Sequence, residues 1–124
     1  MADSSASLHE SPQTLKPETV DCHRAIVSLM EELEAVDWYA QRVEAASDKE
    51  LAAILAHNRD EEKEHAAMVL EWLRRRDAKL DEHLRHYLFT EKPVLEIEEA
   101  LDQAEAGSSD GSLGIGSLRA GAVK

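Results

Sequence analysis

The 124-residue sequence has few cysteines, prolines, glycines and aromatic residues, and fewer basic than acidic residues. Its one cysteine, Cys22, excludes an internal disulfide and suits a reducing cytoplasm. No apolar run reaches the roughly 18 residues of a membrane span, and the polar N-terminus lacks the apolar core of a secretory signal. Lysine and arginine number 14 against 26 acidic residues, a net charge of −12. We therefore expect a cytoplasmic protein that attracts cations, with neither nucleic acid nor an anionic membrane as a partner.

What the sequence has in abundance is helical periodicity. The segment Lys16–Glu18 predicts a helix start, because proline fits the first turn and Glu18 complements the helix dipole. Residues 1–15 before it are expected to be disordered. Apolar residues then recur every three or four positions and predict a long packed helix ending near Ala46: Cys22, Ile26, Leu29, Leu33, Val36, Ala40 and Val43.

A second long helix is expected from about Asp48 to Arg76 or beyond. Ser47 and Glu50 have the spacing of a capping box, which predicts Ser47 as the N-cap. The inward-facing positions of this helix are apolar at both ends and polar at the centre: Leu51, Leu55, Asn58, Glu62, His65, Val69 and Trp72. Polar residues therefore stand where a helix ordinarily buries apolar side chains.

The remaining pattern completes an all-α prediction, because no stretch alternates as a strand does. The helical period continues through Leu80 and Leu84 until Pro93, and a short helix is expected from Val94. The fold class is thus two long antiparallel helices plus a short C-terminal helix. The structured domain is expected to span residues 16–105, and the Gly- and Ser-rich residues 106–124 to form a flexible tail. Two helices leave one face of each open, which predicts a dimer forming a four-helix bundle.

Glu62 and His65 form a Glu-x-x-His pair on one helix face, and Glu32 stands at a similar distance from the hairpin turn. A two-fold dimer would collect four glutamates and two histidines, the ligand set of di-iron four-helix proteins. Carboxylate and imidazole ligands suit iron and manganese. Tyr39, on the flank of Glu32, is placed to hydrogen-bond a metal-bound carboxylate. The alternative is that Glu62 and His65 pair with each other, or with an arginine of the partner.

Three segments closely resemble the encapsulated ferritin family: VDCHRAIVSLMEELEAVDWYAQRVEA, ILAHNRDEEKEHAAMVLEWLRR and HLRHYLFTE. The resemblance covers about residues 18–91 and includes the Trp38–Tyr39 pair. It implies a ferritin-like bundle whose iron site exists only at a dimer interface, five dimers in a ring, and an encapsulin shell around them. It also implies Glu32, Glu62 and His65 as iron ligands, Tyr39 as their hydrogen-bonding neighbour, and Glu31, Glu34 and Trp38 along the path by which cations approach.

Three further groups of residues give weaker signals. His57, Glu61 and Glu64 share one helix face and suit a peripheral site for calcium or another divalent cation, or else a solvated acidic face. His83 and His86, with Glu82, suit metal or plain solvent exposure. The tail segment SLGIGSLR resembles the peptide by which cargo docks on an encapsulin wall, with three apolar anchors: Leu113, Ile115 and Leu118.

The function predicted from these residues and this resemblance is a ferroxidase. It would oxidise Fe(II) with dioxygen at a di-iron site and supply iron for mineral storage inside an encapsulin compartment of a prokaryotic cytoplasm. Two alternatives stay open: a di-iron peroxidase or oxygen-scavenging protein with the same ligands, and a helical scaffold that binds iron without turnover.

Overall fold

The computed structural model describes residues 7–107, and this part of the chain is helical without a strand. A short 3-10 helix, η1 (Pro12–Thr14), precedes four α-helices: α2 (Pro17–Ala45), α3 (Lys49–Arg76), α4 (Ala78–Tyr87) and α5 (Val94–Gly107). The predicted all-α class is confirmed. None of the helices within residues 7–107 has the length and apolar content needed to cross a bilayer. After Arg76 the chain divides into two compact units, the first containing α2 and α3 and the second α4 and α5.

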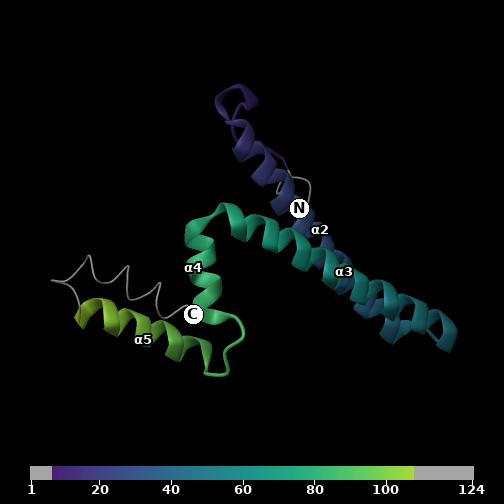
Figure 1. Ribbon diagram of the computed structural model, residues 1–124. Coiled ribbons are helices and arrows are strands. Elements are labelled where there is room, and N and C mark those ends of the chain that lie inside the picture. Colours follow the sequence, from purple (N-terminus) through teal and green to yellow (C-terminus); the bar gives the residue numbers. More distant parts are fainter. Residues whose placement is uncertain (1–6, 108–124) are drawn as a thin grey trace. The chain divides into compact units, whose positions relative to one another are not determined.

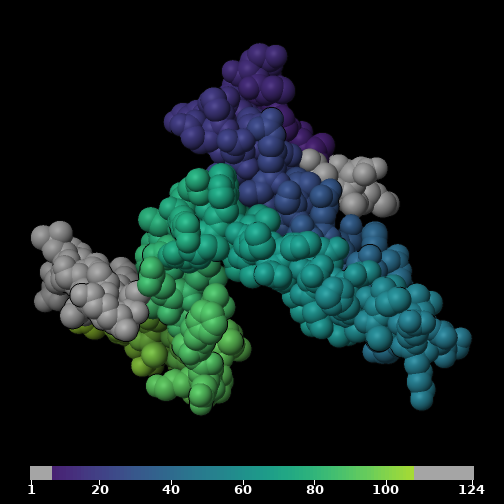
Figure 2. Space-filling model, turned by 45° about the vertical axis from the view of Figure 1, so that its right-hand side comes forward, coloured from purple at the N-terminus to yellow at the C-terminus, as the bar shows by residue number. Residues whose placement is uncertain are grey.

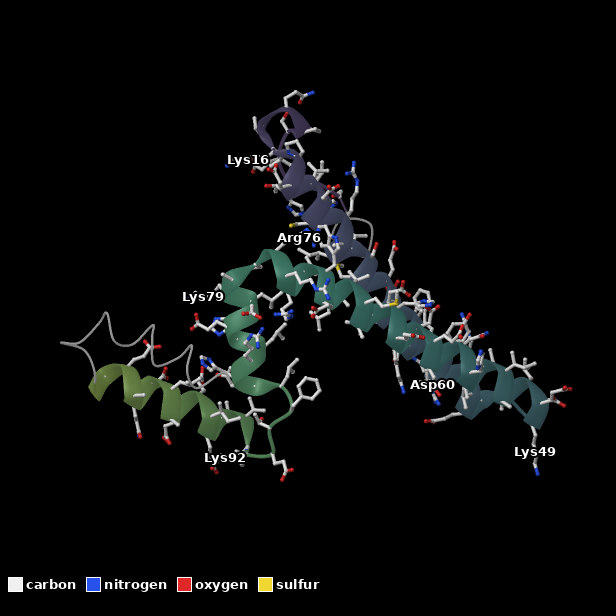
Figure 3. The ribbon with its side chains drawn as sticks, viewed as in Figure 1. Lys16, Lys49, Asp60, Arg76, Lys79 and Lys92 are labelled. Carbon is white, nitrogen blue, oxygen red and sulfur yellow. The ribbon has the colours of Figure 1, made fainter. Side chains whose placement is uncertain are left out.

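The first unit is an antiparallel helical hairpin, with α2 and α3 lying against each other (Figures 1 and 2). Helix α2 begins at Pro17, whose missing N–H is no loss in a first turn. Lys49 and Arg76 mark the two ends of α3, with Asp60 between them (Figure 3). Only residues 46–48 connect the helices, and this short turn determines which residues of α2 lie level with which residues of α3.

The N-cap of α3 is Asp48, so the prediction of Ser47 was wrong by one position. The Asp48 carboxylate accepts a hydrogen bond of 2.7 Å from the backbone N–H of Leu51, three residues on. Serine and aspartate are comparable N-caps in general, and the motif alone does not choose between neighbours. The Asp48 carboxylate adds a charge that the positive end of the helix dipole favours.

Asp77 separates the second long helix from α4. Its carboxylate accepts hydrogen bonds of 3.0 Å from the backbone N–H groups of both Lys79 and Leu80. Residues 78–87 therefore form a helix of their own, α4, where the sequence predicted that the helical period simply continues beyond Arg76. The short helix predicted from Val94 is α5. The continuous helical period across Arg76 hid this break, because a new helix can begin without a change of pattern.

The hairpin has almost no buried core. Among the described residues, only Ala66 and Leu73 are buried, and both belong to α3. Several large apolar side chains of the predicted inward-facing stripes are exposed instead, including Ile26, Leu33 and Leu51. Two helices bury too little apolar surface to offset the conformational entropy lost on folding.

In the second unit, the turn after α4 is formed by a residue in an unusual conformation. Leu88 ends the helix by donating its N–H to the carbonyl oxygen of Leu84 at 2.9 Å. Phe89 follows with φ of 61°, the left-handed region that glycine usually occupies after a helix. The Thr90 hydroxyl donates to the Tyr87 carbonyl at 2.7 Å and steadies the turn. A side chain in this region destabilises the chain by about 1 kcal/mol or more.

The capping assignment gives a test of stability. Asp48→Ala should lower the free energy of unfolding by about 1 kcal/mol, because the Leu51 N–H loses its acceptor at the start of α3. Urea unfolding followed by circular dichroism, at one fixed protein concentration, measures the change. Ser47→Ala is the matched control and should leave the midpoint nearly unchanged. If Ser47→Ala lowered the midpoint and Asp48→Ala did not, Ser47 would be the N-cap.

Candidate metal centre

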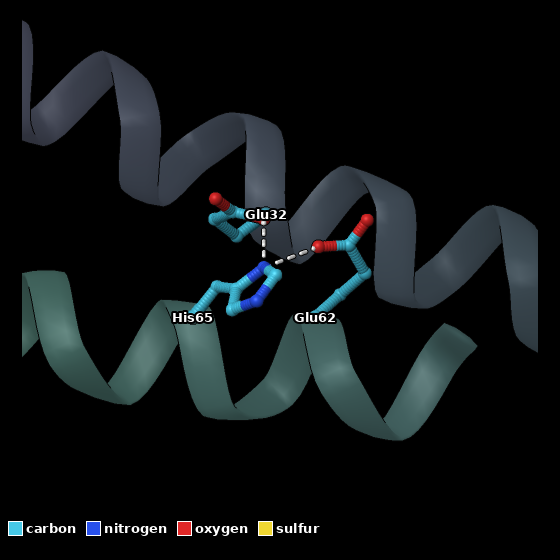
Figure 4. Close-up of side chains that lie close together, drawn as sticks. All are labelled: Glu32, Glu62 and His65. Atoms are coloured by element: carbon cyan, nitrogen blue, oxygen red, sulfur yellow. Dashed lines mark hydrogen bonds and ion pairs between the residues drawn. The ribbon is translucent and has the colours of Figure 1, made fainter. Parts of the chain in front are cut away.

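Three side chains predicted as metal ligands come together at mid-length of the hairpin. Glu32 is supplied by α2, while Glu62 and His65 lie one turn apart on α3 and point toward it (Figure 4). One ligand atom from each lies within 4.8 Å of the other two. This is the one such group of three or more metal-ligating side chains within residues 7–107.

His65 lies between the two carboxylates. Its Nδ1 is 2.9 Å from Oε1 of Glu62 and 3.6 Å from Oε1 of Glu32. The carboxylate side chains keep 23% and 26% of their exposure, and the imidazole 48%. The cluster therefore belongs to the surface of the hairpin, where a further molecule can reach it.

The electrostatics of the cluster favour the binding of a positive charge. The pKa of Glu32 is raised, first by a hydrogen bond shared with Glu62, then by partial burial and by the negative charge of Glu62. The pKa of His65 is also raised, chiefly by its hydrogen bond to Glu62 and further by the charges of Glu32 and Glu61. Protons are thus retained where the carboxylates repel each other, and a divalent cation can take their place.

The donor set fits iron. Carboxylate oxygens and imidazole nitrogen are the ligands used by carboxylate-bridged iron and manganese proteins. One hairpin provides three ligand residues, which is half of the complement that two metal ions have in such proteins. The pairing of Glu62 with His65, kept as an alternative in the sequence reasoning, is also present, at 2.9 Å. The Glu62–His65 pair and a metal site are compatible, because a cation that binds the cluster displaces the proton between these two side chains.

Within the hairpin, the neighbour of Tyr39 is an arginine and not the metal-bound carboxylate that the sequence predicted. The guanidinium carbon of Arg42 lies 5.3 Å from the centroid of the Tyr39 ring. Tyr39 makes no hydrogen bond to Glu32 within the described chain, so contact with a metal-bound carboxylate stays a prediction that requires a second copy. Glu31, Glu34 and Trp38 are exposed on α2 and stand outside the cluster, and their predicted role in cation approach is likewise untested.

The peripheral site is only partly assembled. His57 Nε2 lies 3.5 Å from Oε2 of Glu61, while Glu64 does not join them in a three-ligand group within the described chain. The structure assigns Glu61 a contribution that the sequence reasoning missed, since its charge helps to raise the pKa of His65 four residues on. The spacing of four on one helix was the available signal. Among residues 7–107, His83 and His86 do not belong to a group of three or more metal-ligating side chains either.

Fold and site together define a helical hairpin with a cluster of two carboxylates and one histidine, of the kind that can hold a metal ion, on its open face. The chain matches the family described as EncFtn-like over residues 7–91. It is 66% identical to an encapsulated ferritin-like protein of Rhodospirillum rubrum, over 96% of this chain and 92% of that one. It therefore belongs to the EncFtn-like family, and the resemblance to encapsulated ferritins is confirmed.

Two further relatives extend the comparison. An encapsulin nanocompartment cargo protein of Myxococcus xanthus is 33% identical, over 71% of this chain and 76% of that one. The crystal structure of protein NE0167 from Nitrosomonas europaea superposes with a TM-score of 0.69 at 66% sequence identity. The match covers 71% of this chain and 97% of the NE0167 chain. The two proteins therefore share the helical fold over nearly the whole length of the NE0167 chain.

The raised pKa of His65 gives a prediction for the metal-free protein. An NMR titration should place this pKa above 6.5, and Glu62→Gln should lower it because the largest cause of the shift is removed. A histidine whose pKa is raised by folding contributes stability that is fully present below pH 6.5 and is lost as the pH rises through the folded-state pKa. Glu62→Gln should therefore flatten the dependence of stability on pH in that window. An unchanged His65 titration in Glu62→Gln would contradict the hydrogen bond.

Proposed function

We propose that this protein is a ferroxidase that oxidises Fe(II) with dioxygen at a di-iron site shared between two copies of the chain. The observation that carries the proposal is the convergence of Glu32, Glu62 and His65 from two helices, within 4.8 Å, on a face that remains open to solvent. Membership of the EncFtn-like family supports an iron-related role for these ligands.

The shared site follows from what one hairpin lacks. A single copy offers two glutamates and one histidine, so two copies related by a two-fold axis offer four and two, the complement of a di-iron centre. The same axis would cover apolar side chains that one copy leaves exposed on α2, among them Ile26, Met30 and Leu33. Association thus supplies both the missing ligands and the missing core.

The side chains of the cluster suit iron as a substrate. Glu32 and Glu62 would hold Fe(II) through oxygen atoms, and His65 through a ring nitrogen once its proton has left. Anionic oxygen ligands stabilise Fe(III) more than Fe(II), since the attraction grows with the charge of the ion. Dioxygen accepts the electrons that Fe(II) loses. The open arrangement of the ligands gives substrate a path in from solvent.

The relatives support a location inside an encapsulin shell. One is described as encapsulated and another as an encapsulin nanocompartment cargo protein. We extend this partnership to the present chain, together with a ring of five dimers and a prokaryotic cytoplasm as its setting. The tail segment with Leu113, Ile115 and Leu118 is the proposed docking peptide, and it lies outside the residues that the structure describes.

Ligand substitutions test the activity. Glu32→Ala, Glu62→Ala and His65→Ala should each reduce the initial rate of aerobic Fe(II) oxidation by more than about tenfold, because symmetry removes the ligand from both halves of the site. Absorbance of Fe(III) over time measures the rate. Asp60→Ala is the matched control: it removes a carboxylate from the same helix, one bound to Arg59 and Lys63 instead.

The time course also separates the alternatives. A ferroxidase continues past the iron that its sites can hold, whereas a non-catalytic scaffold stops at that stoichiometry. Preference for peroxide over dioxygen would indicate the peroxidase. If His65→Ala oxidised Fe(II) at the wild-type rate, the iron site would not be formed by Glu32, Glu62 and His65. Tyr39→Phe should only modulate the rate, since the tyrosine is proposed to contact a ligand and not the metal.

Metal and association should be linked. Without a cation, the proposed interface gathers four carboxylates, and their repulsion opposes dimer formation. Adding Fe(II) under anaerobic conditions to chelator-treated protein should therefore raise the molar mass measured by size exclusion with light scattering. Glu32→Ala should weaken this response. Equal masses with and without metal, at micromolar protein, would mean that apolar contacts alone hold the copies together.

A further inference from the structure

The polar centre of α3 has a third member that the metal cluster does not explain. Asn58, Glu62 and His65 follow one another along the predicted inward-facing positions of the helix, at spacings of four and three residues. Glu62 and His65 belong to the cluster. Asn58 is half-buried, and its side-chain amide makes no hydrogen bond within residues 7–107. Its two amide N–H groups are therefore available to an acceptor.

An asparagine at this position is unfavourable for the hairpin alone. The same inward-facing positions are apolar toward both ends of α3: Leu51, Leu55, Val69 and Trp72. Asparagine is a poorer helix former than leucine, and a partly buried amide without a partner has lost water without gaining a protein hydrogen bond. A residue that breaks the local pattern in this way is typical of a functional position.

Glu62 has an oxygen on the side of Asn58. Its Oε1 lies 2.9 Å from Nδ1 of His65, and its other oxygen points away from that ring (Figure 4). Asn58 precedes Glu62 by four residues, a spacing at which side chains on one helix reach each other, and it lies on the opposite side of Glu62 from His65. Arg59 is a second donor near Glu62 in sequence, but its Nε bonds Oδ1 of Asp60 at 3.1 Å.

We propose that Asn58 is a positioning residue for the metal centre, and that its amide donates a hydrogen bond to the second oxygen of Glu62 when a cation occupies the cluster. The inference rests on the proposed metal site. In the metal-free chain, Glu62 shares hydrogen bonds with Glu32 and His65. A cation that displaces their protons leaves the Glu62 carboxylate fully ionised, and an ionised acceptor binds an N–H more strongly than a neutral one. The amide would then orient the carboxylate toward the cation.

Asn58→Leu separates a positioning role from a structural one, because the two roles predict opposite signs. In chelator-treated protein at one fixed concentration, the substitution should raise the midpoint of urea unfolding, since leucine suits an inward-facing helix position better. The affinity of the cluster for Zn(II), a probe without redox chemistry, should fall by about tenfold or more. Competition with a chromogenic chelator measures this affinity, and Glu62→Ala identifies which part of the bound Zn(II) belongs to the cluster.

Two further variants and a control test the hydrogen bond itself. Asn58→Gln keeps an amide and should retain more of the Zn(II) affinity than Asn58→Leu. Asn58→Asp exchanges the donor for a carboxylate, so its affinity relative to the wild type should fall further as the pH rises from about 5 to about 7. The ratio for Asn58→Leu should not change with pH. Gln41→Leu removes an amide that bonds Asp37 on α2 and should keep the wild-type affinity.

The outcomes distinguish this inference from the proposed function. If the wild type binds Zn(II) in the cluster and Asn58→Leu binds it equally well, the positioning role of Asn58 is wrong and the ferroxidase proposal stands. A lower unfolding midpoint in metal-free Asn58→Leu, with unchanged Zn(II) affinity, would make Asn58 a structural residue. If the wild type binds no Zn(II) that depends on Glu62, both the metal site and the role of Asn58 are overturned.

Discussion

The repulsion between the carboxylates of Glu32 and Glu62 is the interaction on which the rest of the protein depends. Helices α2 and α3 hold these groups together, and the proton shared between them raises the pKa of Glu32. His65 offsets only part of the charge, since it faces both carboxylates at once. Such a cluster is stable when something positive enters it. This charge balance supports the proposal that a divalent cation binds at the centre of the hairpin.

The same constraint explains why the apolar residues are arranged as they are. An apolar stripe without its polar centre would close by hydrophobic contact in many registers. In the proposed dimer, the charged groups at one level of the hairpin would favour the arrangement that brings ligands around the same cation. The three-residue turn and its Asp48 cap contribute to this precision, because they set Glu32 level with Glu62 and His65.

Sequence reasoning reached the long helices and the ligand cluster because both obey helical spacing. Glu62 and His65 share a face by their separation of three, and the short turn sets the level of Glu32. The N-cap at Asp48 and the break at Asp77 were missed, since each depends on which of several suitable side chains actually bonds a free N–H. The left-handed Phe89 was also invisible, because no propensity predicts a phenylalanine in the conformation that glycine prefers.

The scarcity of buried residues has a consequence for the newly made chain. With only Ala66 and Leu73 buried in the described part of one copy, few of its backbone amides are shielded by packing. Local opening of the lone hairpin is therefore frequent, and proteases and hydrogen exchange act on the open form. The proposed assembly would protect what folding alone leaves exposed. The lifetime of a subunit in the cell would then rise with the concentration of its partners, and surplus copies would be removed without a dedicated signal.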